Sequence, residues 1–451
     1  MSGYVDLEEL KRQASRVVDL ACRGGATTAV AVLDQNADLN LEVRNGEIEN
    51  LNEAESHLVR LTVSKHGRRA TVSSCDWLPD SLNGLVERAM EMCRYTDNDP
   101  CYTLPETDLL AQEVGDLDLF DEDLLEMGTE EKIHMAVDLE RQLLARDQRL
   151  ISESTKLSTV VGGSAIANSA GFCQAETSSL IGVSAMAFAE DRSQGDLNTG
   201  RKQKGYWYSE AHHIEDLEPS ENIAAKAADR ILRKLGARKP ATGKYPVYFE
   251  PPVARSLWAH LLNAMSGSEL YRHESYLVDR LGTRVCSPAV TIADDPKRKR
   301  GLGSRAYDAE GVATSYRILV EEGMLRSYLL GTYSANKLKM RSTGHAGGPG
   351  NVVIQPGDLD ESEMLRRMGT GVWVTSLFGQ GANTATGDYS RGAFGLWVEN
   401  GKIAYPIMEF TLNSHLDRMF QDVVMVGGNV QQGFATLTPG IVVGEMTIGG
   451  G

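Results

Sequence analysis

Residues 371–406 read GVWVTSLFGQGANTATGDYSRGAFGLWVENGKIAYP. An apolar run typical of a buried strand leads into a glycine-rich loop, and a second apolar run ends at Asn400-Gly401. An Asn-Gly pair tolerates positive φ at both central positions of a tight turn, so it favours a hairpin between residues 395–399 and 402–407. The stretch therefore predicts antiparallel strands packed closely around a loop.

The same pattern extends over the C-terminal half. A second hairpin is expected between residues 316–320 and 324–330, around Glu322-Gly323. Helical patterns are sparse beyond residues 238–244, where RKPATGK combines Pro, Gly and polar residues. We place the main domain boundary there and expect a β-rich C-terminal domain with a few helices.

The N-terminal half mixes helices with hairpins. Asp6 followed by Glu9 predicts a capping box, and the helical spacing of apolar residues continues to Gly24-Gly25. Hairpins are expected around Asn45-Gly46, between residues 39–43 and 48–51, and around His66-Gly67, between residues 58–64 and 69–74. Further helices are expected at residues 79–95, 129–146 and 219–235, and several strands within residues 158–190.

These patterns predict an α+β protein with three units. Residues 1–106 form an N-terminal α/β domain with helices packed on an antiparallel sheet. Residues 107–237 form a central domain that continues the N-terminal half, and residues 238–451 form the β-rich C-terminal domain.

Composition limits the functional classes. The 451 residues are 41% hydrophobic and 24% charged, and their net charge is −16. Such a surface repels phosphates, so no direct nucleic-acid binding is expected. The charged N-terminus MSGYVDLEELKRQ, the lack of a long apolar run and six cysteines without a CxxC pair predict a cytoplasmic protein with no membrane segment.

Two charged segments allow more than one interpretation, and a histidine pair allows one exclusion. Between residues 94 and 132 acidic side chains accumulate without Lys, Arg or His, as in a solvated connector or an acidic docking surface. Residues 297–300 (KRKR) fit a solvated loop or a contact with an acidic partner or nucleic acid. His212 and His213 are adjacent, so on a strand they would face opposite sides and could not share one metal ion.

Residues 371–406, taken with the run STGHAGG at residues 342–348, resemble the TldD/PmbA family, whose members are also called modulators of DNA gyrase. The resemblance covers nearly the whole chain and points to the PmbA (TldE) branch. In the TldD branch, a matching helix carries His-Glu-x-x-x-His, whose histidines bind zinc and whose Glu polarises water. A cysteine near the C-terminus supplies a further ligand.

The corresponding helix here follows Pro251-Pro252 and contains His260-Leu261-Leu262-Asn263-Ala264-Met265. By this resemblance His260 keeps the first ligand position, Leu261 replaces the base and Met265 replaces the second ligand. No cysteine follows Cys286. A catalytic zinc ion needs about three protein ligands and a nearby proton acceptor. We therefore predict no catalytic residue and no metal in this chain, and expect zinc in a TldD-like partner.

Four residues remain candidates for lining a peptide chamber: His260, His345, Gln380 and Asn383. His345 lies in the glycine-rich run at residues 342–350, where backbone N–H groups and an imidazole could hold a peptide carbonyl or carboxylate. Alternatively, His345 is an internal hydrogen-bonding residue of a tight turn. Gly379-Gln380-Gly381 lacks the following Lys-Ser/Thr of a phosphate loop, so close packing explains it better.

The resemblance implies a non-catalytic subunit of a two-component zinc metallopeptidase. Its partner would be a TldD-like subunit, and its substrates would be unfolded or modified small peptides, in peptide-antibiotic maturation or antitoxin turnover. Two alternatives stay open: a self-sufficient metallopeptidase that uses His260 and His345, or a non-proteolytic protein that modulates DNA gyrase. A homodimer is the alternative assembly for the chain alone.

Overall fold

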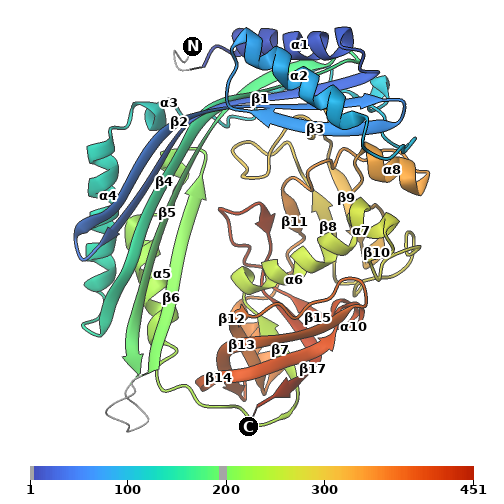
Figure 1. The fold of residues 1–451 in the computed structure, drawn as a ribbon. Coiled ribbons are helices and arrows are strands. Elements are labelled where there is room, and N and C mark those ends of the chain that lie inside the picture. The colour runs from blue at the N-terminus through green and yellow to red at the C-terminus, as the bar shows by residue number, and fades with distance from the viewer. Residues whose placement is uncertain (1–4, 192–200, 451) are drawn as a thin grey trace.

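The computed structural model describes residues 5–191 and 201–450 of the chain. A long, strongly curved antiparallel sheet forms the N-terminal half, and the C-terminal half lies on its concave side (Figure 1). Helices cover the convex side of the sheet. The predicted α+β class is therefore confirmed.

The N-terminal sheet has six strands in the order β3-β2-β1-β4-β5-β6. The strands are β1 (Thr28–Arg44), β2 (Glu47–Lys65), β3 (Arg68–Ser74), β4 (Leu150–Asn168), β5 (Cys173–Asp191) and β6 (Arg201–Ala211). Because β1 pairs with both β2 and β4, a single sheet joins residues 1–106 to residues 107–237. The division of the chain at residues 106 and 237 stays a prediction.

Both predicted N-terminal hairpins are confirmed. Asn45 and Gly46 adopt φ values of 54° and 77°, and His66 and Gly67 adopt 51° and 74°. The strands are much longer than the expected segments, since β1 and β2 have 17 and 19 residues. Polar residues that were excluded from the predicted strands lie on the concave or exposed faces of these longer strands.

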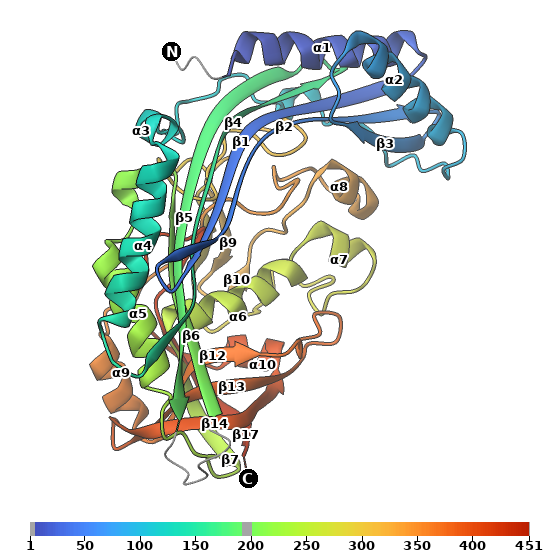
Figure 2. The same ribbon diagram turned by 60° about the vertical axis from the view of Figure 1, so that its left-hand side comes forward.

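Four long helices cover the convex face of the sheet. Figure 2 shows α1 (Leu7–Arg23) and α2 (Pro79–Cys93) over one end of the sheet and α4 (Thr129–Leu144) and α5 (Ser220–Leu232) over the other. Each end has its own apolar cluster between helices and sheet. The four predicted helices are confirmed, with ends that differ by a few residues. A fifth, short helix is α3 (Glu122–Glu126).

The start of α1 differs from a complete capping box. Asp6 accepts hydrogen bonds from the backbone N–H groups of Glu8 and Glu9, both at 3.0 Å. The Glu9 carboxylate, however, accepts from the Gln13 side chain at 2.6 Å and pairs with Arg12. The cap therefore rests on Asp6, and Glu9 stabilises the helix through neighbours one turn further on.

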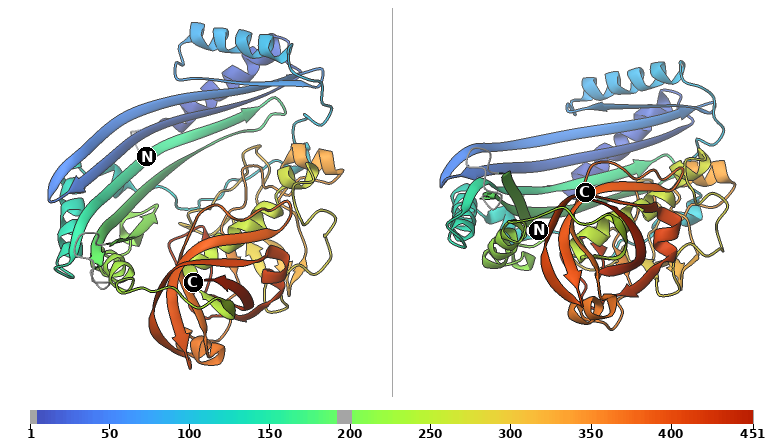
Figure 3. Two further views of the ribbon diagram at one scale, coloured as in Figure 1. Left: turned by 60° about the horizontal axis from the view of Figure 1, so that its bottom comes forward. Right: turned by 90° about the horizontal axis from the view of Figure 1, so that it is seen from below.

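The C-terminal half contains a small closed barrel, which Figure 3 shows end on. Its sheet runs in the order β14-β13-β12-β7-β17-β15, and pairing between β14 and β17 closes it. Its strands are β7 (Gly243–Phe249), β12 (Gly371–Phe378), β13 (Asp388–Glu399), β14 (Lys402–His415), β15 (Val423–Val426) and β17 (Ile441–Gly449). Asn400 and Gly401, with φ values of 51° and 74°, form the predicted β13–β14 turn.

A second, five-stranded sheet has the order β10-β9-β8-β11-β16. Its strands are β8 (Ile292–Asp294), β9 (Arg317–Glu321), β10 (Met324–Leu325), β11 (Val352–Ile354) and β16 (Thr436–Leu437). The turn at Glu322-Gly323 is confirmed, although β10 covers only two of the expected residues. The helices of this half are α6 (Pro251–Ala264), α7 (Gly267–Tyr271), α8 (Thr332–Leu338), α9 (Glu361–Met368) and α10 (Leu416–Gln421).

The acidic segment after α2 ties the two halves together. Asp99 pairs with Lys337 at 2.6 Å, and Arg341 pairs with Glu106 at 2.6 Å and with Asp108. The segment therefore connects the two halves and docks on the C-terminal half of its own chain. This arrangement lies between the solvated connector and the acidic docking surface that the sequence allowed.

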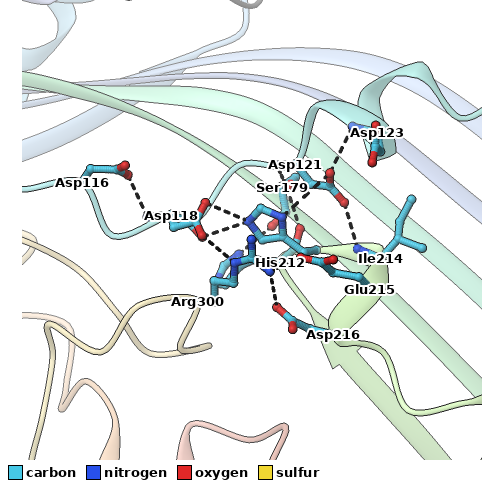
Figure 4. Close-up of polar contacts among 11 residues, drawn as sticks. Asp116, Asp118, Asp121, Asp123, Ser179, His212, Ile214, Glu215, Asp216 and Arg300 are labelled. Atoms are coloured by element: carbon cyan, nitrogen blue, oxygen red, sulfur yellow. Dashed lines mark hydrogen bonds and ion pairs between the residues drawn. The ribbon is translucent and has the colours of Figure 1, made fainter.

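The basic run at residues 297–300 contributes to the same junction. Figure 4 shows Arg300 reaching Asp118 of the acidic segment, at 2.5 Å, and Asp216, at 3.3 Å. His213 contacts the Asp118 carbonyl through Nε2 at 3.0 Å, whereas His212 contacts the Ser179 carbonyl through Nδ1 at 2.6 Å. The two adjacent imidazoles thus have separate neighbours.

A buried carboxylate fixes α5 to the barrel. Glu250, which is 5% exposed, pairs with Arg230 at 2.7 Å and with Arg233 at 3.2 Å. It also accepts a hydrogen bond from Trp373 Nε1 at 3.1 Å. A buried carboxylate with three donors is well satisfied, and removing it would take one acceptor from each of two arginines.

Candidate functional site

The helix that follows Pro251-Pro252 occupies the centre of the C-terminal half. Its apolar side packs on the barrel, and Leu261 and Met265 are both 0% exposed within the main apolar cluster. Ala259 and Asn263 are exposed on the opposite side. His260 lies between these sides and is half-buried.

His260 faces the start of β13. Its ring lies 6.1 Å from the ring of Tyr389, edge to face. Within the described residues, His260 Nε2 and the Tyr389 hydroxyl are buried without a hydrogen-bond partner. Burial lowers the pKa of His260, and the nearby Arg391 lowers it further, so the imidazole is neutral at neutral pH.

The glycine-rich loop (residues 379–387) lies against the end of α6. The Asn263 side chain donates to Thr384 Oγ1 at 3.3 Å, and the Tyr276 N–H donates to the Thr384 carbonyl at 2.9 Å. A Cβ atom on Gly381 would lie 1.6 Å from the Ser390 carbonyl oxygen, so only glycine fits there. Close backbone packing therefore explains this glycine.

Gln380 and Asn383 are both exposed in this loop. The Asn383 side chain accepts from the N–H groups of Ala385, at 2.9 Å, and Thr386, at 3.3 Å, so it forms an Asx turn. That these two residues line a peptide chamber stays a prediction.

The neighbouring charges Asp388 and Arg391 have different partners. Asp388 accepts from Thr386 Oγ1 at 2.6 Å, while Arg391 donates to the Gly379 carbonyl at 3.1 Å. Both contacts hold the loop.

His345 lies elsewhere, beside the five-stranded sheet. It is 5% exposed, and its Nδ1 contacts Thr343 Oγ1 at 2.9 Å while its Nε2 contacts Asp294 Oδ2 at 3.1 Å. Both ring nitrogens are therefore occupied by internal partners. A role in lining a peptide chamber would require these contacts to change.

The residues around α6 do not fit a catalytic zinc ion. His260 is the one imidazole of this helix, while Leu261 and Met265, which the resemblance predicts at the positions of the base and of the second ligand, are an aliphatic side chain and a thioether enclosed in the core. Among residues 5–191 and 201–450, no three His, Cys, Asp or Glu side chains are grouped closely enough to share a metal ion. Three ligands and a proton acceptor are therefore not available here.

Sequence reasoning missed Tyr389 and Glu250 as organising residues. Tyr389 belongs to the Gly-Asp-Tyr-Ser-Arg-Gly run, whose glycines signalled a special backbone but not the buried hydroxyl beside His260. Glu250 directly precedes Pro251-Pro252, and a carboxylate at the end of an apolar strand was the available signal for a buried pair.

Three family profiles match most of the chain. They are described as PmbA/TldA metallopeptidase domain 1 (residues 29–93), central domain (residues 122–235) and C-terminal domain (residues 242–450). The part of the chain that the structure describes contains no helix long and apolar enough to cross a membrane.

Relatives in two bacteria match nearly end to end. Metalloprotease PmbA of Escherichia coli O157:H7 is 35% identical over 442 residues, which cover 98% of this chain and 96% of that protein. A PmbA homologue from Haemophilus influenzae, also called a metalloprotease, is 33% identical over 449 residues, with 98% and 96% covered.

Solved structures share the whole fold. A Bacteroides thetaiotaomicron protein, provisionally described as a modulator of DNA gyrase, superposes with a TM-score of 0.91 at 26% identity and covers 98% of this chain and 99% of its own. TldE from Thermococcus kodakarensis has a TM-score of 0.85 at 18% identity, with 97% and 100% covered, so this likeness concerns the fold alone.

Proposed function

This chain belongs to the PmbA/TldD family of metallopeptidases, and from that premise we propose that it is the non-catalytic subunit of a two-component zinc peptidase. In this proposal a TldD-like partner of related fold holds the zinc ion. The substrates are unfolded or modified small peptides, and the setting is the cytoplasm.

One observation carries the proposal. Leu261 and Met265, at the positions of the base and the second ligand, are both 0% exposed inside the apolar core of the barrel. Neither side chain can take a proton from water, and a thioether suits soft metals better than a water-activating Zn²⁺ site. The lone imidazole of His260 cannot supply the remaining functions.

The architecture supports a structural role. The long sheet curves around the C-terminal half, so a partner of similar shape could complete a closed chamber (Figure 1). Strands β3 and β6 are the edges of this sheet. An exposed edge can add an extended peptide as a further strand, with main-chain hydrogen bonds providing the affinity.

The test compares this chain, its TldD-like partner and their mixture in a peptide-cleavage assay, with zinc measured by elemental analysis. We expect stoichiometric zinc only in the partner and cleavage only in the mixture. Replacing the histidines of the partner should abolish cleavage, while His260→Ala in this chain should leave the rate of the mixture within about twofold, since about 0.4 kcal/mol of barrier gives that factor.

Two results would contradict the proposal. Zinc-dependent turnover by this chain alone would favour the self-sufficient metallopeptidase. Full activity of the partner alone would make this chain dispensable. Size-exclusion chromatography of each sample would also show whether the isolated chain forms a homodimer.

A second candidate is a non-proteolytic protein that acts on DNA gyrase. The description of the Bacteroides thetaiotaomicron structure favours it. The net charge of −16 disfavours contact with DNA but allows contact with a protein. Recovery of gyrase, without a TldD-like chain, on the tagged protein would support this candidate.

A further inference from the structure

A cavity of about 450 Å³ separates the concave face of the long sheet from the C-terminal half. Strands β1 to β5 form one wall, residues 102–105 of the acidic segment form a second, and residues 305–310 of the C-terminal half form a third. Its volume lies within the range of about 300–1,000 Å³ that is usual for ligand sites. The α6 site contributes no residue to this cavity.

Some charged groups of the cavity wall already form hydrogen bonds within the protein, although Arg305 Nε is buried without a partner in the described residues. Asp308 accepts from the N–H groups of Glu310, Val312 and Ala346 at 2.9–3.0 Å. The Glu310 carboxylate accepts from the Thr332 N–H at 2.8 Å, and Arg305 donates to the Gly348 carbonyl. These three side chains therefore build the wall.

Three further charged side chains of the wall are not paired. Within the described parts of the chain, Arg60, Arg69 and Glu176 form no ion pair and no side-chain hydrogen bond. Arg69 lies 5.4 Å from the centre of the Tyr102 ring, a contact that leaves its N–H groups available. Burial raises the pKa of the Glu176 carboxyl, with no cation nearby to oppose it.

The strand register separates the opposite charges. Arg60 pairs with Val32, Val32 with Ile166 and Ile166 with Gln174, so three strand spacings lie between Arg60 and the strand of Glu176. Three spacings amount to about 14 Å, and the two-residue step from Gln174 to Glu176 adds about 7 Å along the strand. The two positions are therefore about 16 Å apart on the same face of the sheet.

We infer that this cavity binds a short, extended peptide by its two free ends, with the α-ammonium group at Glu176 and the α-carboxylate at Arg60. An extended tripeptide spans about 10 Å, and charge-assisted hydrogen bonds of about 2.8 Å at each end bring the total to about 16 Å. Val30, Val32 and Tyr307 provide apolar contacts between the ends. The choice of a peptide rests on the proposed function.

The charge pattern argues against simpler ligands. An inorganic anion at the arginines would gain nothing from Glu176, whereas a ligand ammonium group would stabilise its ionised form. An apolar ligand would leave the buried Glu176 carboxyl without a partner, which is unfavourable. A zwitterion with its charges at opposite ends pairs both Glu176 and Arg60.

The test is calorimetric titration of the purified full chain with trialanine, compared with N-acetyl-trialanine amide and with inorganic phosphate. We expect trialanine to bind, and the blocked peptide to bind at least about tenfold more weakly, as the loss of about 1.4 kcal/mol of charge pairing would give. Glu176→Gln and Arg60→Gln should each weaken trialanine binding by a similar factor. The matched controls Glu55→Gln and Arg44→Gln, on exposed positions of the same sheet, should leave it unchanged.

Equal binding of the free and the blocked peptide, or no binding of trialanine by the wild-type chain, would overturn the inference, and neither result depends on a variant folding. Phosphate binding that equals trialanine binding and is lost only in Arg60→Gln would reveal an anion site instead. Trialanine binding by a chain that does not support cleavage in the mixture would refute the proposed function alone. Cleavage in the mixture without trialanine binding would refute the inference alone.

Discussion

The interior beneath α6 and the cavity beneath the long sheet differ in the side chains that line them, since the first is apolar and the second contains charged groups. Beneath α6, Leu261 and Met265 are fully enclosed by apolar neighbours. In the cavity, Arg60, Arg69 and Glu176 have no ion pair and no side-chain hydrogen bond within the described residues. The contrast places these charged groups in the cavity, away from the apolar interior beneath α6.

The largest expected effect tests the apolar side of this contrast. Leu261→Glu would place an unpaired carboxylate in the barrel core, so it should reduce the free energy of unfolding by about 3–5 kcal/mol. Urea denaturation measures this value. Ala259→Glu, on the exposed side of the same helix, should change it little. Similar stability of the two variants would mean that the interior beneath α6 is open to water.

The next effect concerns the cavity wall. Burial is the main reason that the pKa of Asp308 rises from 3.8 to about 6. Between these pH values the folded state holds a proton that the unfolded state releases, so stability falls as pH rises from about 4 to about 6, by about 3 kcal/mol in total. Asp308→Asn should lack this fall, as urea denaturation at several pH values would show.

Asp99 provides a control of opposite sign. The hydrogen bond from Lys337 is the main reason that the pKa of Asp99 is lowered to about 2. Its contribution to stability is present above pH 4 and is lost as the pH falls towards 2. Asp99→Asn should therefore flatten the acidic limb and leave the range between pH 4 and 6 unchanged. If Asp308→Asn and Asp99→Asn gave the same dependence of stability on pH, the burial of Asp308 in the cavity wall would be contradicted.

A smaller effect on stability is expected where Arg300 pairs with the acidic segment. Arg300→Ala removes the pairs with Asp118, Glu215 and Asp216, so the urea midpoint should fall and protease cleavage within residues 94–121 should accelerate. The difference from wild type should shrink between about 0.1 M and 1 M salt, where the screening length falls from about 10 Å to 3 Å. Lys297→Ala, in the same basic run, should behave as wild type. A loss of stability in Arg300→Ala that does not depend on salt would indicate that Arg300 acts through packing.

The smallest effect concerns His260. Its buried Nε2 has no partner within the described residues, so His260→Leu should change the free energy of unfolding by no more than about 1 kcal/mol. His345→Leu is the contrast, because both ring nitrogens of His345 are hydrogen-bonded and its loss should cost about 2 kcal/mol or more. A large loss for His260→Leu would contradict this expectation and show that the imidazole stabilises the folded chain itself.

Local signals predicted much of the fold. Asn45-Gly46, His66-Gly67 and Asn400-Gly401 each marked a real hairpin, because positive φ at two successive positions is a local property of the chain. Strand lengths were underestimated, since polar residues such as Asn36 and Asn40 belong to β1 on a face that the apolar pattern does not mark.

Contacts between distant segments could not be predicted from the sequence. Arg300 and Asp118 are 182 positions apart, and no local pattern links a basic run to one acidic residue among many. The resemblance predicted replaced metal ligands at residues 260–265, and this stays a prediction, whereas no local pattern pointed to the cavity. Its charges come from separate strands and meet only after the sheet has formed.

The central pairing of β1 with β4 affects how the protein emerges from the ribosome. Val30 must find Asn168, a partner synthesised about 140 residues later, which at about 5–20 residues per second takes roughly 7–28 s. During this interval the β1–β2 hairpin has an unpaired edge that can join another nascent chain. Cells that make this protein in quantity should therefore depend on a chaperone that shields the hairpin until β4 arrives.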